Sequence, residues 1–497
     1  MQLKTNNEPI NNHKKMKKYL ILLTSLLAML VISCSKDKGN YNLVPINEIK
    51  ITGTVPDLIN IYQFETLKIE PVLEQSKKLD ENKLIYSWTT FLVANPDKGY
   101  VLGNSKNLNA RIEVKPGKYF ILYTVKDPET GVSFFKQYRM DVGTKLSEGW
   151  MALVDQPNGK QEISMVNTAE EIMHNLYENA NSGKSLPENT YAIKALNGYN
   201  GQLLFMLAKA DAVELDYIGM KQFGEFKSWF YTPPATINPQ NYFFTNSGTT
   251  GFIINDNEIY STTYTSGGST LFGSPVRGDW KLSPFTFPSF FRDNILVYDT
   301  KNQRFLKFAS AAIAPLGNPS GSAFDPNKVG KQLIFGAPGW DEKYNCLLKN
   351  NNDDQYFIYR VDANYGAPII AAEQYKVDDA PELNQAKLFT SSGQLPHLYY
   401  AVGNKIYILD IPAGKARLAY TFPVGTEITA IELKQSYSVF YPDDSRELVA
   451  ATYVAGQGSL YKFAIGNTGD FTNNTYAKVY TGFSRIKDLE FKNASFY

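Results

Sequence analysis

YYAVGNKIYILD, residues Tyr399–Asp410, is the stretch that decides the fold of most of this chain. Strand-like runs of alternating character flank Gly403-Asn404, a dipeptide that suits the tight turn of a β-hairpin. The same pattern of strand, turn and strand recurs through the rest of the C-terminal region. It is found at 201–218, 250–263, 294–309, 398–422 and 448–465. Short runs at such spacing predict antiparallel hairpins in series.

These hairpins repeat with a period that fits a ring of small sheets. The region from 146 to 497 holds about 350 residues, and at about 40–50 residues for each four-stranded unit it predicts a seven-bladed β-propeller. The repeats are degenerate and carry no WD or kelch signature. A large β-sandwich is therefore the alternative arrangement.

The region before the repeats, 45–145, has a different texture. Between Ile46 and Val142, short β-branched and aromatic runs alternate apolar with polar residues and are separated by turn residues. This is the pattern of half-buried antiparallel strands, and about a hundred residues of it predict an immunoglobulin-like sandwich. The fold class that we expect is all-β, with a sandwich followed by a propeller.

Two motifs in this region resemble those of the polycystic-kidney-disease (PKD) domain. Tyr86-Ser87-Trp88 matches a Y-x-W strand, and KPGKYFILYTVKD at 115–127 matches the pattern P-G-x-Y-x-x-x-x-x-V-x-D. The resemblance implies that Trp88 is the core tryptophan between two sheets. The usual W-x-F-G-D-G continuation is replaced by Trp88-Thr89-Thr90-Phe91, so the region is PKD-like and not a standard member.

Met16–Cys34, MKKYLILLTSLLAMLVISC, has the features of a bacterial lipoprotein signal. Two lysines precede an apolar run, and Val31-Ile32-Ser33-Cys34 forms a lipobox whose thiol can be acylated. The apolar run is shorter than the ~20 residues that a transmembrane helix needs. We therefore expect a start at Met16, removal of the signal region 1–33, and a tether over 34–44. Cys34 is expected to carry a diacylglycerol and an N-acyl chain such as palmitate.

With this signal, and with Gly39-Asn40-Tyr41 after it, the chain resembles the PKD-like lipoproteins of Bacteroidota. The resemblance implies an outer-membrane protein exposed at the cell surface, beside a TonB-dependent SusC-like transporter and its SusD-like lipoprotein. It implies an accessory subunit, not an enzyme, that captures oligopeptide or oligosaccharide for import. The alternative is a propeller-type hydrolase of the same polymers.

Charge and the scarcity of certain side chains limit the chemistry. Lys and Arg (50) nearly balance Asp and Glu (49), which gives no electrostatic basis for a nucleic-acid partner or for membrane contact other than through the lipid. Cys346 is the one cysteine besides Cys34, and its apolar surroundings predict a small buried side chain. Beyond the signal region the histidines are His174 and His397. We therefore predict no metal site, no catalytic triad and no cofactor apart from the lipid.

Aromatic residues cluster in loop-like segments that contain Gly and Pro. Rings in such loops can stack on a sugar or grip a peptide. The candidates are Trp229, Tyr231, Trp280, Phe290 and Phe291. Blade cores also use aromatic residues, so each ring has a core position as its alternative.

Three polar segments invite local predictions. Thr168-Ala169-Glu170-Glu171 has the form of a capping box and predicts a helix that continues through Ala180. Asn350–Asp354 and Asp127–Gly131 offer oxygen atoms to a calcium ion but lack the spacing of a calcium loop. For these two segments we predict a solvated hairpin loop and a plain turn.

Overall fold

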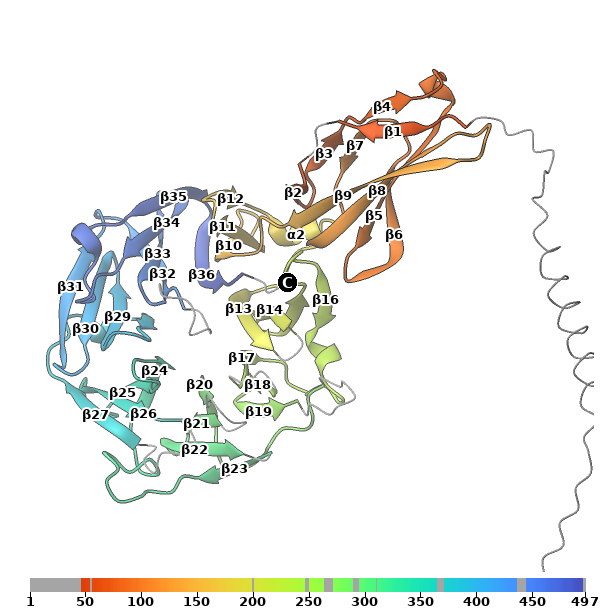
Figure 1. Cartoon of the computed structure of the whole chain (residues 1–497). Coiled ribbons are helices and arrows are strands. Elements are labelled where there is room, and N and C mark those ends of the chain that lie inside the picture. Colours follow the sequence, from red (N-terminus) through yellow and green to blue (C-terminus); the bar gives the residue numbers. More distant parts are fainter. Residues whose placement is uncertain are drawn as a thin grey trace, which may run out of the picture.

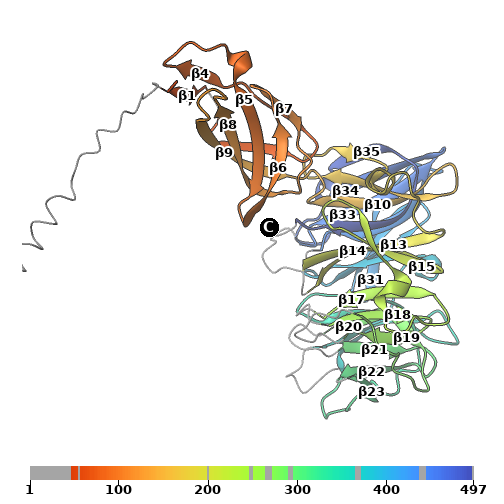
Figure 2. The ribbon, with the colours of Figure 1, turned by 90° about the vertical axis from the view of Figure 1, so that its right-hand side faces the viewer.

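The computed structural model describes residues 46–53, 56–198, 201–245, 250–262, 271–288, 295–309, 311–363, 371–435 and 444–494. Within these ranges the chain is almost entirely β-structure (Figure 1), and none of the described helices has the length and apolar character needed to cross a membrane. A small sandwich precedes a ring of sheets, which Figure 2 shows from its side. The predicted all-β architecture, a sandwich followed by a propeller, is confirmed.

The sandwich consists of one large sheet and two small ones. The five-stranded sheet has the order β2-β9-β8-β5-β6, in which β2 and β9 run parallel and the other neighbours antiparallel. The small sheets pair β1 with β4 and β3 with β7. The elements are β1 (Ile49–Thr52), β2 (Leu58–Tyr62), β3 (Thr66–Ile69), β4 (Val72–Gln75), η1 (Glu81–Lys83), β5 (Ile85–Leu92), β6 (Asn95–Gly103), β7 (Leu108–Arg111), β8 (Gly117–Lys126) and β9 (Ser133–Gly143).

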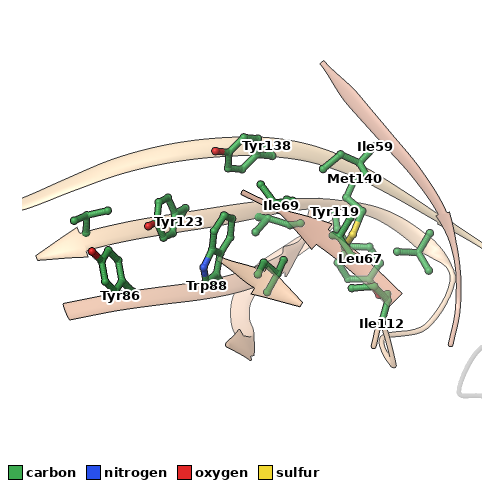
Figure 3. Packing of buried hydrophobic residues seen from close by; sticks show 14 of the residues in the cluster. Ile59, Leu67, Ile69, Tyr86, Trp88, Ile112, Tyr119, Tyr123, Tyr138 and Met140 are labelled. Atoms are coloured by element: carbon green, nitrogen blue, oxygen red, sulfur yellow. The ribbon is translucent and has the colours of Figure 1, made fainter. Parts of the chain in front are cut away.

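The sandwich core is centred on Trp88, which is fully buried (Figure 3). Its ring stacks on Tyr123 of β8 with 3.9 Å between the ring centroids. Its Nε1 donates a hydrogen bond to the Ser105 carbonyl at 2.9 Å, so the polar edge of the indole is satisfied. The core position that the PKD resemblance implied for Trp88 is confirmed.

Seven sheets follow one another around the ring (Figure 1). Each has antiparallel strands, four in every sheet except the third, where three are described. In blades 2–7 the strands follow one another in sequence order, and the first strand lies toward the centre of the ring. Blade 2 has β13 (Thr190–Gly198), β14 (Gly201–Ala208), β15 (Asp211–Leu215), β16 (Gln222–Glu225) and η2 (Phe226–Trp229); blade 3 has β17 (Pro239–Phe244), β18 (Gly251–Asn255) and β19 (Glu258–Ser261); blade 4 has β20 (Leu282–Pro288), β21 (Ile295–Asp299), β22 (Arg304–Ala309) and β23 (Ala312–Pro315). Blade 5 has β24 (Gln332–Pro338), β25 (Tyr344–Lys349), β26 (Tyr356–Val361) and β27 (Ala371–Val377); blade 6 has η3 (Leu383–Gln385), β28 (Leu388–Ser391), β29 (His397–Val402), β30 (Lys405–Asp410) and β31 (Lys415–Thr421); blade 7 has β32 (Glu427–Leu433), β33 (Glu447–Val454), β34 (Gln457–Ala464), η4 (Thr472–Asn474) and β35 (Lys478–Phe483).

Blade 1 is built from both ends of the repeat region. Its outer strands β10 (Gly149–Asp155), β11 (Gln161–Asn167) and β12 (Ile172–Met173) come from the start, and its innermost strand β36 (Arg485–Lys492) comes from the end. β36 pairs antiparallel with β10 along its whole length. The last strand therefore closes the ring, and the predicted number of seven blades is confirmed.

Both faces of a blade are covered by its neighbours, which explains why the strands are so apolar. In β10, Trp150 and Ala152 pack toward blade 7, while Met151 and Leu153 pack toward blade 2. Burial of each large apolar side chain contributes roughly 1.5–3 kcal/mol, so the contacts between blades supply the driving force for the ring. Cys346 of β25 is one of these packed side chains, and burial raises the pKa of its thiol. Its predicted role as a small buried side chain is confirmed.

The helix predicted from Thr168 is wrong in position. The side chain of Asn167, not of Thr168, accepts the amide of Glu171 at 2.9 Å, and the turn so formed leads into β12. The helix, α2 (Leu176–Ala180), begins later. The buried carboxylate of Glu162 on β11 accepts two backbone amides at its start, at 2.8 and 3.0 Å. The helix is therefore capped by a side chain from a neighbouring strand, whereas the local sequence predicted a cap from Thr168.

The passage from sandwich to propeller is short, since β9 ends at Gly143 and β10 begins at Gly149. Lys145 pairs with Glu65 of the sandwich at 3.7 Å and with Glu171 of blade 1 at 3.2 Å. The buried Lys492 of β36 donates to the backbone carbonyls of the same passage, one of them that of Ser147 at 2.9 Å. That 45–145 and 146–497 fold as separate domains stays a prediction.

Candidate functional site

The first predicted ligand-binding ring, Trp229, lies in the packing between blades 2 and 3. It is 7% exposed, and its indole meets Phe205 and Tyr242 edge to face at 5.3 and 5.7 Å between centroids. This position favours a structural role, because a ring enclosed in this way has no free face for a ligand. Tyr231, two residues further along the chain, is 67% exposed and does present its ring at the surface.

Of the remaining candidates, one is described by the structure and two are not. Trp280 is half-buried and packs against the apolar cluster between blades 3 and 4. Phe290, Phe291 and Cys34 lie outside the described residues. Of the three candidates that the structure describes, Trp229 is enclosed between blades, Tyr231 is exposed and Trp280 packs on another cluster, so these three do not form one site.

Ionisable side chains gather instead at the centre of the ring, where the chain closes. Lys194 comes from β13 of blade 2, Asp488 and Glu490 from β36 of blade 1, and Glu432 from β32 of blade 7. All four are half-buried and lie on innermost strands. We call these four residues the closure cluster.

Hydrogen bonds tie the carboxylates of the closure cluster to neighbouring blades. Asp488 Oδ2 accepts the backbone amide of Ile193 at 2.8 Å, across the gap between blades 1 and 2. Glu432 Oε1 accepts the Thr390 hydroxyl of blade 6 at 3.1 Å. The first of these bonds gives the buried backbone amide of Ile193 a partner, as buried amides require, and the second links two side chains of neighbouring blades.

Burial moves the pKa values of this cluster toward neutrality. It raises the pKa of Asp488 to about 6, of Glu490 to about 7 and of Glu432 to about 8. For Lys194, burial alone would lower the pKa, but the carboxylates of Glu490, Asp488 and Glu432 outweigh it and raise the pKa. Carboxyl pKa values shifted toward neutrality in this way are typical of binding and catalytic sites, although structural ion-pair clusters show them as well.

The innermost strands of blades 4–6 carry a row of aromatic residues. Phe285 of β20, Phe335 of β24 and Phe389 of β28 are half-buried and come from three successive innermost strands. Phe335 lies 5.6 Å from each of the other two ring centroids, so the three form a continuous row. The innermost strands thus carry an aromatic row on blades 4–6, packed against the clusters between these blades, and ionisable side chains on blades 7, 1 and 2.

The two histidines beyond the signal region, His174 and His397, lie in the packed parts of the blades or bond to a neighbouring strand. The Nδ1 atom of His174 lies 2.9 Å from the Ser164 hydroxyl. His397 is buried, and burial lowers its pKa. Among the described residues no three His, Cys, Asp or Glu side chains are arranged to hold a metal ion.

In the two segments considered for calcium, aspartate side chains have hydrogen-bond or ion-pair partners in the protein. Asp353 accepts the amide of Gln355 at 2.9 Å, and Asp354 pairs with Lys349 at 2.6 Å. Asp127 accepts the amide of Glu129 at 2.9 Å, which closes the predicted turn. These bonds account for the polar side chains without a cation.

The closure cluster was missed in the sequence, although a signal was present. Each of its residues has an apolar residue on both sides or alternates with apolar residues along an inner strand, as in ITAIEL at 428–433 and DLEF at 488–491. A charge at such a position resembles the solvent-facing half of an ordinary alternating strand. To recognise the closure cluster, one must know that neighbouring blades cover both faces of the strand. Only the arrangement of the blades in the ring shows this.

Comparison with known proteins bears on the N-terminal part of the chain. The model of the PKD-like family matches residues 34–189, which span the sandwich and the first strands of the propeller. The search of curated proteins finds no match. We therefore assign the PKD-like likeness to this part of the chain and not to the whole.

Solved structures with related architecture are distant. A quinonprotein alcohol dehydrogenase-like protein from Bacteroides thetaiotaomicron is 14% identical, with a TM-score of 0.47, and the match covers 91% of this chain and 100% of that one. The WD40 domain of SCAP from fission yeast is 11% identical, with a TM-score of 0.37, over 59% of this chain and 74% of that one. PorZ, a surface component of the type-IX secretion system of Porphyromonas gingivalis, is 11% identical, with a TM-score of 0.34, over 75% and 46%.

Proposed function

We propose that this chain is a lipid-anchored binding protein of the outer membrane, exposed at the cell surface, and an accessory subunit of a TonB-dependent SusC/SusD-like importer. The lipobox that ends at Cys34 supports the anchor, because acyl chains on an N-terminal cysteine hold the following body at a membrane. The PKD-like sandwich stands between this anchor and the propeller in the chain, which suits a spacer.

The observation that carries the binding role is the pair of side-chain groups on the innermost strands of the propeller. Half-buried aromatic rings lie on blades 4–6, and the closure cluster supplies hydrogen-bonding groups on blades 7, 1 and 2. A ligand with both apolar faces and polar substituents, such as an oligopeptide or an oligosaccharide, fits such a lining. No cofactor is required for this role.

One observation favours the alternative, a hydrolase of the same polymers. Burial raises the pKa of Glu490 to about 7 and of Glu432 to about 8, so the protonated form of each carboxyl group is populated at neutral pH. A protonated carboxyl group can act as a general acid in hydrolysis. The binding role is preferred because Asp488 and Glu432 are already engaged by Ile193 and Thr390.

Two assays test this proposal. Cells fed labelled palmitate should label the wild-type chain and leave Cys34→Ala unlabelled; equal labelling of both would contradict the anchor. The purified protein should release no product from casein peptides or from neutral oligosaccharides. Turnover that disappears in Glu432→Gln or Glu490→Gln would instead establish the hydrolase.

A further inference from the structure

A second aromatic surface lies away from the ring centre, between the outer strands of blades 6 and 7. It consists of Tyr420 on β31, Tyr461 on β34 and Tyr476, which follows η4. β31 and β34 belong to neighbouring blades in Figure 1. We call these three residues the rim tyrosines.

The rim tyrosines form one connected group. The ring of Tyr476 stands at 82° to the rings of Tyr461 and Tyr420, with 4.9 and 6.4 Å between centroids. Phe463 packs beneath, 5.0 Å from Tyr420 and 6.4 Å from Tyr476. The buried ring of Phe463 thus supports a layer of phenol rings above it.

The outer layer is accessible and polar at its tips. Tyr476 is 36% exposed, and Tyr420 and Tyr461 are half-buried. Burial raises the pKa of Tyr461 and of Tyr420, and each of these shifts is increased by the neighbouring Tyr476 hydroxyl. With 4.9 and 6.4 Å between the ring of Tyr476 and those of Tyr461 and Tyr420, one ligand can contact more than one phenol group.

The backbone holds Tyr476 in place. Asn473 and Asn474 both adopt left-handed conformations, with φ of 58° and 54°. The amide of Ala477 then donates to the Lys462 carbonyl on β34 at 2.7 Å. The ring of Tyr476 is thus presented on a short segment that is fixed on both sides, which lowers the entropy lost on binding.

The charges beside the rim tyrosines are paired with each other. Arg417 Nε lies 2.8 Å from Asp470 Oδ1, and a second guanidinium nitrogen donates to the Thr468 carbonyl at 2.9 Å. A charged ligand would find no unpaired counter-ion in this pair. An uncharged ligand with flat C–H faces and many hydroxyl groups matches the surface better, because phenol rings combine an apolar face with a hydroxyl group.

We infer that the rim tyrosines are a binding site for a neutral oligosaccharide. This inference deepens the proposed function, since it rests on the chain being a binding protein and chooses glycan over peptide for this surface. It does not depend on the importer. The site is separate from the closure cluster and uses residues other than the five predicted rings.

The test uses the full chain with Cys34→Ala, which carries no lipid. Maltohexaose, cellohexaose, xylohexaose and mannohexaose are titrated in turn by isothermal calorimetry. At least one should bind, and Tyr476→Ala or Tyr461→Ala should weaken that binding at least fivefold. Tyr100→Ala, an exposed tyrosine of the sandwich, is the matched control and should bind as the parent does.

Two outcomes overturn the inference: none of the four sugars binds, or the affinity is unchanged in both alanine variants. The double variant Tyr461→Phe/Tyr476→Phe keeps the ring packing and so covers the case of an alanine variant that does not fold. It should weaken binding at least twofold through the lost hydroxyl groups, and an unchanged affinity would likewise contradict the site. Failure here with successful copurification of the importer would reject the glycan site alone.

Discussion

The sandwich and the propeller differ in how they use polar groups inside the fold. In the sandwich, the core around Trp88 and Tyr123 is apolar and aromatic, and every strand contributes one face to it. In the propeller, the apolar packing lies between blades, and the centre carries four ionisable side chains where the last strand meets the first blades. A sandwich is stabilised by a single core between its sheets. A propeller also needs interactions that hold its last strand in the first blade, where the ring closes.

The largest effect should follow from removal of the closing strand. A chain that ends at Ser484 lacks β36, so β10 loses its inner partner and the blade 7 to blade 1 packing loses Ile486, Leu489 and Phe491. Calorimetry should show that the propeller transition is lost while the sandwich transition remains. A propeller transition within a few degrees of wild type would show that closure is not what holds the ring.

The second effect concerns the sandwich alone. Trp88→Ala removes the central ring of its core and should cost about 3–5 kcal/mol of unfolding free energy. The sandwich should unfold at a lower denaturant concentration, followed by near-ultraviolet circular dichroism, with the propeller transition unchanged. Simultaneous loss of both transitions would mean that the two parts are one cooperative unit.

The third effect is a pH dependence of the stability of the propeller. Burial raises the pKa of Glu432 to about 8 from 4.5, so folding favours the protonated form. Its contribution to stability is therefore full below about pH 4.5 and is lost as the pH rises toward 8. Glu432→Gln should stabilise the propeller relative to wild type at pH 9, on the order of 1–3 kcal/mol, and change little at pH 4.5.

Glu427 on the same strand is the matched control, because its hydrogen bond with Arg485 lowers its pKa. Its contribution is present above pH 4.5 and is lost as the pH falls through the lowered pKa. Glu427→Gln should therefore be slightly less stable than wild type at pH 9. Equal behaviour of the two variants in urea titrations at pH 4.5 and 9 would contradict the buried state of the closure cluster.

The smallest effect lies at the junction between the two parts. Lys145→Ala breaks exposed ion pairs with Glu65 and Glu171, and we expect almost no change in the free energy of unfolding because solvent screens such pairs. It should nevertheless speed limited proteolysis between Gly143 and Gly149, because this side chain bridges sandwich and blade 1. An unchanged cleavage rate would show that Lys492 and the backbone alone hold the passage.

Sequence reasoning succeeded where the pattern is local and repeated. The alternating residues and the Gly-Asn turn of a hairpin such as Tyr399–Asp410 predict its two strands. The spacing of these hairpins predicts seven blades, as the structure has. Sequence reasoning failed where residues distant in the chain determine the local structure or the burial of a side chain. Glu162 replaces the expected cap of α2, and Trp229 is enclosed by blade 3 residues that no local pattern connects with it.

Copurification from native outer membranes tests the central claim, that this is the anchored accessory subunit of an importer, most directly. The tagged wild-type chain is extracted in mild detergent and its partners are identified by mass spectrometry, with Cys34→Ala as the control. We predict that a TonB-dependent transporter and a SusD-like lipoprotein accompany the wild type and not the control. Recovery of the wild-type chain from the membrane without either partner would contradict the claim.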